Sequence, residues 1–418
     1  MRNSPVWWLI IAIMILIDIY VFFAARSLIN ISSTKSRTLF TIIYWSLSVI
    51  ALIILLLLPY FHFSGQNKLM RSTIFALVFA LFFAKIIAAL FFLIDDIRRG
   101  VQWISGKLFS EQNEISEVAG ASGEHISRSS FLTWLGVMAG GGIFSTFVYG
   151  LSNKYNYHLI RVKMAFDNLP ADFKGLKIIH ISDIHSGSFT NFNAVAKGVD
   201  MILNEKPDII LFTGDLVNNK SDEVGAYQKI FSRLQAPMGV YSTLGNHDYG
   251  DYAEWTSLTA KAENLEKLKQ VHAAMGWRLL LDEHLPLKKG NAEIGLIGVQ
   301  NISGKARFHT YGNLAKAMQG AENYPFKILM SHDPSHWDKE VNTKYTDIDL
   351  TLSGHTHGMQ FGVEIPGFRW SPVQYVYKQW AGLYEQGKQK LYVNRGYGFI
   401  GYPGRVGILP EITVIELT

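Results

Sequence analysis

The chain has 418 residues, of which 49% are hydrophobic and 17% charged, and its formal net charge is +5. This length suits two or three domains. There is no cysteine, which excludes disulfides, zinc–thiolate sites and thiol catalysis. The basic residues are scattered, and many flank apolar runs instead of forming one stripe. We therefore expect membrane lipids, and no nucleic acid, among the partners.

Long apolar runs dominate the first third of the chain. Four of them approach the roughly 20 residues that a helix needs to cross a bilayer, and they cover residues 6–25, 39–61, 74–94 and 131–151. The second contains a run of isoleucine and leucine without the polar face of an amphipathic core helix. The pattern predicts an α-helical membrane region over residues 1–151 with about four spans.

Two ionisable residues interrupt these apolar runs. Asp18 lies near the middle of the first run, and Lys85 lies near the middle of the third. If the spans alternate in direction, the first and third helices run the same way, so the two side chains lie at similar depth. Charges at mid-membrane are costly and usually find partners. We expect an Asp18–Lys85 pair that holds the helices together, in preference to a proton relay.

The segment between the third and fourth runs bears on the orientation of the chain. Residues 95–130 mix glutamates with small and apolar residues, which indicates a partly helical connector at the membrane surface. Residues 127–132 resemble a twin-arginine export signal in which Ser129 replaces the second arginine. Seven Lys and Arg residues lie in the loops after the first and third spans, and six lie on the opposite side of the membrane. Both clues favour a multi-pass protein of the cytoplasmic (inner) membrane, with its second half on the extracytoplasmic side.

The second part of the chain, residues 152–418, alternates apolar runs of strand length with amphipathic stretches. The pattern predicts an α/β domain whose sheets are covered on both faces. The expected strands cover residues 176–181, 208–213, 240–244, 294–299, 327–330 and 348–352, and the expected helices cover 194–204, 254–274 and 312–321.

Polar side chains with metal-binding chemistry follow five of these strands. They are Asp183, His185, Asp215, Asn246, His247, Asp248, His332, His355 and His357. Because α/β sheets place their ligand sites at the carboxyl ends of strands, we expect these side chains to meet in one site.

The spacing of these residues indicates a pair of metal ions. Asp183 and His185 alternate along one turn, so both can reach one cation. Asp215 follows a glycine and can bridge two cations roughly 3.5–4 Å apart, as in two-metal phosphate displacement. His355 and His357 offer one imidazole to each metal. Mixed imidazole, carboxylate and amide ligands suit manganese, iron or zinc better than calcium.

Together, the five segments resemble the signature of the calcineurin-like metallophosphoesterase superfamily, over roughly residues 177–418. The resemblance implies a two-sheet sandwich flanked by helices, two divalent metal ions, and attack on a phosphate ester by a hydroxide that bridges them. It implies that the first metal is held by Asp183, His185, Asp215 and His357, and the second by Asp215, Asn246, His332 and His355.

The same resemblance implies catalytic roles for two further residues. His247 would contact the phosphoryl group or protonate the leaving oxygen, and Asp248 would orient the His247 ring. The segments 354–360, 394–396 and 410–412 are similar to a bacterial membrane-associated branch, whose relatives include lipid A pathway pyrophosphatases. Many relatives have an acidic residue three positions after the bridging aspartate, where this chain has Asn218. This difference bears on which substrate is bound more than on whether the site is catalytic.

Two features concern the substrate. Arg395 lies in a glycine-rich loop and could clamp a substrate phosphate or pin the loop to a carbonyl. The aromatic stretch 368–380 could line a lipid tail, face a membrane or simply pack in the core.

The sequence thus predicts a membrane-anchored hydrolase of phosphate ester or anhydride bonds, with a lipid-linked or amphipathic substrate. One alternative is a UDP-2,3-diacylglucosamine pyrophosphatase of lipid A biosynthesis, which needs a cytoplasmic site. A second alternative is a non-catalytic membrane sensor or scaffold.

Overall fold

The computed structural model describes residues 5–29, 33–57, 67–109 and 128–418. The chain divides into two compact units, Met1–Tyr149 and Gly150–Thr418. Each unit has its own hydrophobic clusters and is described separately below.

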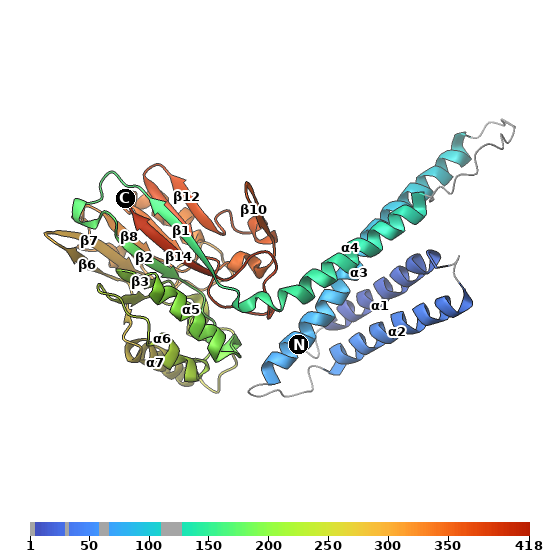
Figure 1. Cartoon of the computed structure of the whole chain (residues 1–418), viewed down its shortest axis with the longest axis horizontal. Helices are drawn as coiled ribbons and strands as arrows, with labels where there is room; N and C mark the ends of the chain where they lie inside the picture. The colour runs from blue at the N-terminus through green and yellow to red at the C-terminus, as the bar shows by residue number, and fades with distance from the viewer. Residues whose placement is uncertain (1–4, 30–32, 58–66, 110–127) are drawn as a thin grey trace. The chain divides into compact units, whose positions relative to one another are not determined.

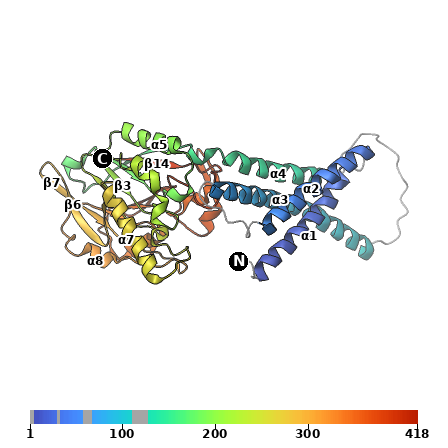
Figure 2. The ribbon, with the colours of Figure 1, turned by 90° about the horizontal axis from the view of Figure 1, so that it is seen from below.

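Four apolar helices make up the described part of the first unit, and Figures 1 and 2 show α1–α4. Each is long and apolar enough to cross a membrane, which confirms the prediction of four helices. They are α1 (Pro5–Ser27), α2 (Thr34–Leu57), α3 (Asn67–Phe109) and α4 (Arg128–Gly150). Small residues bring α3 and α4 together, because a Cβ added at Gly140 would lie only 2.7 Å from the Ala84 carbonyl oxygen.

The predicted ion pair between α1 and α3 is confirmed. Lys85 Nζ lies 2.5 Å from Asp18 Oδ1 and donates a second hydrogen bond, 2.7 Å long, to Ser48 Oγ on α2. Asp18 and Ser48 are both buried. The ammonium group therefore joins three helices, and the carboxylate has the partner that its depth requires.

The predicted connector begins as a continuation of α3. Residues 95–109 are helical, so this helix extends well past the apolar run at 74–94. Asp95 in this extension is buried and accepts a 2.5 Å hydrogen bond from Ser129, near the start of α4. Residues 110–127 of the connector lie outside the described residues, and its position at the membrane surface stays a prediction.

The second unit contains two six-stranded sheets. In the first sheet, β2–β5 run parallel and β14 pairs antiparallel with β2. The order is β1 (His158–Met164), β14 (Glu411–Leu417), β2 (Lys177–Ile181), β3 (Ile209–Phe212), β4 (Val240–Ser242) and β5 (Arg278–Leu279).

In the second sheet, the four inner strands are parallel and the two edge strands are antiparallel to their neighbours. The order is β12 (Gly382–Gln386), β13 (Gln389–Val393), β9 (Leu350–Ser353), β8 (Lys327–Met330), β7 (Ala292–Gly298) and β6 (Glu283–Lys289).

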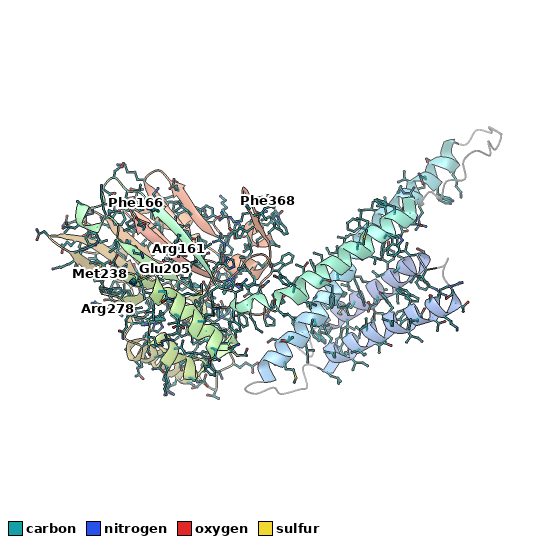
Figure 3. The ribbon with its side chains drawn as sticks, in the orientation of Figure 1. Arg161, Phe166, Glu205, Met238, Arg278 and Phe368 are labelled. Atoms are coloured by element: carbon teal, nitrogen blue, oxygen red, sulfur yellow. The ribbon has the colours of Figure 1, made fainter. Side chains whose placement is uncertain are left out.

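The sheets pack face to face, and helices cover their outer faces (Figure 1). Fully buried side chains of both sheets, such as Ile178 on β2 and Ile328 on β8, fill the space between them. The outer faces carry α5 (Phe192–Asn204) and α7 (Leu258–Ala274) on the first sheet and α8 (Leu314–Met318) on the second. The predicted sandwich is confirmed. An ion pair of 2.5 Å between Arg161 on β1 and Glu205, just past α5, joins helix and sheet (Figure 3).

Candidate metal centre

The nine predicted metal-binding and catalytic residues lie in loops that follow β2, β3, β4, β8 and β9. In each sheet these strands are parallel neighbours, so their carboxyl ends lie at one edge and their loops converge. Six of the residues form two groups with metal-binding atoms close together, namely Asp183, His185 and His357, and Asp215, His332 and His355.

The first group combines one carboxylate with two imidazoles. His185 Nε2 and His357 Nε2 are 3.0 Å apart, and His357 Nε2 lies 3.2 Å from Asp183 Oδ1. All the ligand atoms of the group lie within 4.8 Å of one another. Three nitrogen and oxygen donors that face one point have the geometry of a metal site.

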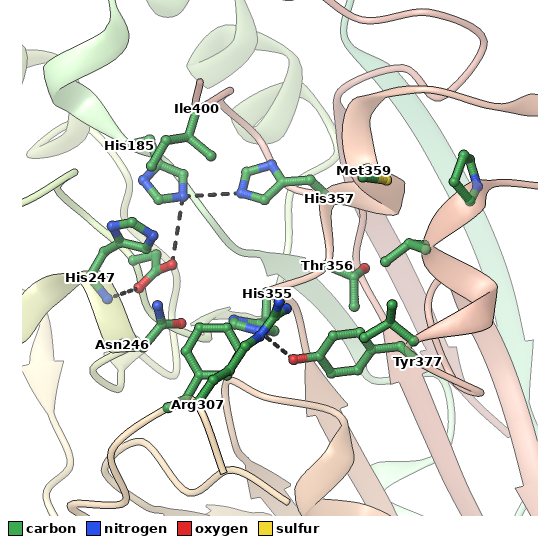
Figure 4. A pocket seen from close by; sticks show the side chains of 15 residues that line it. His185, Asn246, His247, Arg307, His355, Thr356, His357, Met359, Tyr377 and Ile400 are labelled. Carbon is green, nitrogen blue, oxygen red and sulfur yellow. Dashed lines mark hydrogen bonds and ion pairs between the residues drawn. The ribbon is translucent and has the colours of Figure 1, made fainter. Parts of the chain in front are cut away.

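The second group has the same character, and Asp215 links it to the first. His332 Nε2 lies 3.2 Å from Asp215 Oδ2, and His355 Nδ1 lies 3.3 Å from His332 Nε2. The same Asp215 oxygen is 3.6 Å from His185 Nε2 in the first group (Figure 4). A carboxylate oxygen between two groups of imidazoles is where a bridging ligand is needed.

Hydrogen bonds behind the imidazoles fix which nitrogen faces the centre. His332 Nδ1 donates to the Thr213 carbonyl at 2.7 Å, so its Nε2 is the ring nitrogen that faces Asp215. His355 Nε2 contacts the Tyr377 hydroxyl at 2.9 Å, which leaves Nδ1 facing inward. Such contacts orient metal-bound histidines in proteins.

The residues fit a pair of divalent cations. Asn246 Oδ1 is buried without a hydrogen-bond partner, as expected of an oxygen that awaits a cation. Burial alone would raise the pKa of the Asp183 carboxyl, but His357 and its other imidazole neighbours hold it well below its usual value. Burial lowers the pKa of His185, which keeps this imidazole neutral and able to donate a lone pair.

Left-handed backbone conformations are concentrated in this centre. Nine non-glycine residues in the described part of the chain have positive φ, and five of them belong to the two groups. Each such conformation costs on the order of 1–3 kcal/mol and tends to occur at functional sites. The five are Asp183 (φ 54°), His185 (48°), Asp215 (61°), His355 (73°) and His357 (51°).

His247 lies at the edge of the centre and is half-buried. Its backbone N–H donates to Asp215 Oδ1 at 2.8 Å, and its ring Nδ1 donates to the Asn218 carbonyl at 2.7 Å. The ring lines the pocket above the two groups. Because Nδ1 is used by the backbone, Nε2 is the nitrogen available to a substrate.

The prediction that Asp248 orients the His247 ring is wrong. The Asp248 carboxylate points back to the loop after β3 and accepts backbone hydrogen bonds from Asp215, Leu216 and Val217 at 2.8–3.2 Å, and from Gly245 at 2.9 Å. Consecutive side chains of a tight turn point in different directions, so the Asp248 carboxylate does not contact the His247 ring. Burial and the nearby Asp215 raise its pKa to about 7.

Of the two interpretations of Arg395, the one in which it clamps a substrate phosphate is wrong. Its guanidinium is buried, and it pairs with Glu411 through Nη1 and with Glu364 through Nη2, each at 2.5 Å. Arg395 is not among the residues that line the pocket. It pins its loop, as the alternative interpretation held, although the acceptors are carboxylates and not a carbonyl.

A pocket of about 290 Å³ opens above the centre (Figure 4). The metal-binding side chains form one part of its lining, and apolar side chains such as Phe308 and Val376 form another. Arg307 also lines it and is exposed, with its guanidinium 4.6 Å from the Phe308 ring. The sequence did not single out Arg307 as a site residue. Its position in the loop after β7, at the same sheet edge, is the signal that could have found it.

The sandwich and its paired Asp/His groups define a metal-dependent phosphoesterase, and comparisons with known proteins agree. A family model described as "Calcineurin-like phosphoesterase" matches residues 176–359. A second model, "Probable Calcineurin-like phosphoesterase, transmembrane domain", matches residues 1–154.

The chain is also similar to several named metallophosphoesterases and phosphodiesterases. The chain is 30% identical over 303 residues to the uncharacterized metallophosphoesterase YkuE of Bacillus subtilis (strain 168), which covers 70% of this chain and 98% of the relative. It is 28% identical over 319 residues to a transmembrane protein with metallophosphoesterase domain of Danio rerio, covering 75% and 67%. Phosphodiesterase YaeI of Escherichia coli (strain K12) is 29% identical over 267 residues, covering 62% and 88%. The chain therefore belongs to the calcineurin-like metallophosphoesterases.

Proposed function

We propose that this metallophosphoesterase hydrolyses a phosphodiester or pyrophosphate bond of a lipid-linked or amphipathic substrate. The observation that carries the proposal is the pairing of two metal-binding groups around Asp215 with a pocket that offers both Arg307 and apolar side chains. A phosphate suits the metals and the guanidinium, and an acyl or isoprenoid chain suits the apolar part of the lining.

The proposed roles follow from the positions of the side chains. One metal ion would be held by Asp183, His185, Asp215 and His357, and the other by Asp215, Asn246, His332 and His355. When bound, such a pair activates water at neutral pH and neutralises charge on the phosphoryl oxygens. We assign proton donation to the leaving oxygen to His247, through Nε2. Arg307 holds a non-bridging phosphate oxygen.

The two-metal assignment is tested with His332→Ala in the full-length chain. We expect loss of bis(p-nitrophenyl) phosphate hydrolysis and a fall in bound manganese, iron or zinc, measured by plasma mass spectrometry. His158→Ala is the matched control, because His158 is exposed on β1 away from the centre. Unchanged hydrolysis in His332→Ala would refute the assignment. A wild-type protein that binds phosphodiesters in the presence of metal without turnover would favour the sensor or scaffold.

We propose that the catalytic unit lies on the extracytoplasmic side of the inner membrane. The distribution of Lys and Arg near the spans and the altered twin-arginine segment support this side. A periplasmically active phosphatase and a cytoplasmically fluorescent protein, each fused after Thr418, test it. Phosphatase activity alone would exclude the UDP-diacylglucosamine reaction. Fluorescence alone would reverse the orientation and favour that reaction.

A further inference from the structure

A short hairpin near the metal pocket stands apart from both large sheets. It consists of β10 (Val363–Ile365) and β11 (Phe368–Trp370), which pair only with each other in the described part of the chain. The turn between them includes Gly367 with φ of +78°, a conformation that glycine adopts without strain. The hairpin is labelled by its first strand in Figure 1.

The register of the hairpin sorts its residues onto two faces. Val363 lies opposite Trp370, and Ile365 lies opposite Phe368. Side chains alternate along a strand, so these four apolar residues share one face. The third pair, Glu364 and Arg369, occupies the other face.

The charged face of the hairpin is tied to the body of the domain. Glu364 accepts a hydrogen bond from Arg395, which also pairs with the buried Glu411 on β14. The Arg369 guanidinium lies 5.1 Å from the ring of Trp380, which is buried. This arrangement is the reverse of a normal surface hairpin, whose apolar face packs on the core and whose charges face water.

The outward face is accordingly exposed. Ile365 is 59% exposed and Phe368 54%, and Figure 3 labels Phe368 on the hairpin. Six of the ten exposed large hydrophobic side chains of the second unit fall within 18 residues of sequence. We call this set the apolar face, and it consists of Met359, Val363, Ile365, Phe368, Tyr375 and Val376.

The apolar face is continuous with the metal pocket. Met359 and Val376 belong to the face and also line the pocket. Trp370 Nε1 contacts the Tyr375 hydroxyl at 3.4 Å, which connects the hairpin to the segment that carries Val376. A surface that binds this face therefore lies against the mouth of the pocket.

We propose that the apolar face docks on a lipid bilayer and holds the mouth of the metal pocket at the membrane surface. The same chain carries four helices that can span a membrane, so a bilayer is always present at high effective concentration. Exposed apolar side chains of this kind enter the boundary between headgroups and acyl chains. Exposure of these side chains to water is energetically unfavourable, and their insertion into the bilayer removes this cost.

Basic side chains beside the apolar face match the anionic headgroup layer. Arg307 and Lys378 are exposed, and Lys305 lies with its ammonium 5.3 Å from the Tyr377 ring at the pocket. Lys305 and Lys378 also line an adjoining groove of about 350 Å³, together with Asp338. Apolar groups at the acyl boundary with cations at the phosphate level are typical of interfacial membrane contacts.

The absence of cysteine from the chain permits a direct test. We would place single cysteines at Ile365 and Phe368 in the full-length chain and label them with an environment-sensitive fluorophore. The protein is reconstituted in phosphatidylethanolamine–phosphatidylglycerol vesicles that contain lipids spin-labelled near the headgroup. Leu258→Cys is the matched control, because Leu258 is an apolar residue on α7 that is 87% exposed.

We expect the lipid spin labels to quench the fluorophores at Ile365→Cys and Phe368→Cys, and iodide in the water phase to quench the control. Quenching of the two hairpin labels by iodide alone would overturn the proposal. Protection from both quenchers would also overturn it, because the face would then be covered by a second copy or another protein.

A second variant tests whether the apolar side chains of the hairpin are responsible for the docking. Ile365→Asp/Phe368→Asp places two carboxylates on the face without touching the pocket lining. With the label at Tyr375→Cys, lipid quenching is expected to fall about fivefold or more, since acidic groups are costly in lipid. Hydrolysis of soluble bis(p-nitrophenyl) phosphate should stay unchanged. Unaltered quenching would overturn the proposal. Because quenching requires no turnover, this failure is distinct from a failure of the phosphoesterase assignment.

Discussion

The Asp18–Lys85 ion pair provides the most direct test of packing in the membrane unit. Lys85→Met keeps an unbranched side chain but removes the ammonium that joins α1, α2 and α3. The variant leaves the Asp18 carboxylate, whose side chain is only 5% exposed, without its charged partner. The Ser48 hydroxyl loses its contact with the ammonium as well.

The size of the effect follows from the contact distance and the burial. At 2.5 Å and an effective dielectric constant of 20, the attraction amounts to roughly 7 kcal/mol before desolvation, which offsets much of it. Removing one partner of a buried pair costs about 3–5 kcal/mol, so we expect Lys85→Met and Asp18→Asn each to lose about this much. The double variant has no charge left to bury, and it should cost less than the summed losses by about 2 kcal/mol or more.

The assay is equilibrium unfolding of the full-length chain in lipid–detergent bicelles by added sodium dodecyl sulfate. Arg99→Met is the control in the same helix. Its side chain is 59% exposed and pairs with Asp96 and with the buried Asp95. Without Arg99, Asp95 keeps its contacts with Arg98 and Ser129, and Asp96 keeps its hydrogen bond from Tyr20, so the loss should stay below about 1 kcal/mol. If the Lys85 and Asp18 losses add within about 0.5 kcal/mol in the double variant, the two residues are not coupled and the reasoning fails.

Three further predictions concern the catalytic unit. Asp248→Ala removes the shared acceptor of backbone N–H groups and should lower the free energy of unfolding by about 2–4 kcal/mol, measured by denaturant titration, and unchanged stability would contradict its anchoring role. Arg307→Ala should raise the KM for a phosphodiester about tenfold without loss of bound metal, and an unchanged KM would remove Arg307 from the substrate site. Burial lowers the pKa of His272 to about 3, below the roughly 6.5 of the unfolded chain. Stability is therefore lost as pH falls from about 6.5 toward 3, and His272→Gln should flatten this loss in thermal melts between pH 7 and 5, whereas an equal slope would contradict it.

The sequence predicted the strands that carry the candidate metal ligands because these strands are continuous apolar runs. The central strands of a covered sheet are buried on both faces, so their composition is unmistakable. It did not predict β14, although this strand lies inside the first sheet. Glu411 and Glu416 interrupt its apolar run, and Glu411 is buried there because Arg395 neutralises it.

Element boundaries depended on local chemistry that periodicity does not contain. The expected helix over residues 254–274 begins instead at Leu258. Ser257 precedes it as the N-cap, and its hydroxyl accepts from the Ala260 backbone N–H at 3.0 Å. Serine is a favoured N-cap residue, so Ser257 marks the start of this helix more accurately than the periodicity does.

The candidate metal ligands were easier to predict than the residues around them. The spacing of Asp183, His185 and His357 reflects a turn after a strand, and parallel strands bring such turns together. The direction of one side chain within a turn is a different matter. Asp248 follows His247 directly, yet it contacts the loop after β3, because the turn rotates it toward unpaired backbone N–H groups. Which backbone N–H groups still lack a hydrogen-bond acceptor is determined by the packing of the loops, which the sequence does not show.

The contrast between Arg395 and Arg307 shows why charge in a sequence is not charge available to a substrate. Arg395 lies in a glycine-rich loop typical of phosphate binding, but Glu411 and Glu364 already neutralise it. Arg307 is exposed at the pocket, and no carboxylate pairs with it in the described residues. A phosphate must compete with two carboxylates at the first site and with none at the second. The Glu364–Arg395 ion pair also holds the charged face of the hairpin against the domain, so it contributes both to occupying this arginine and to leaving Ile365 and Phe368 exposed.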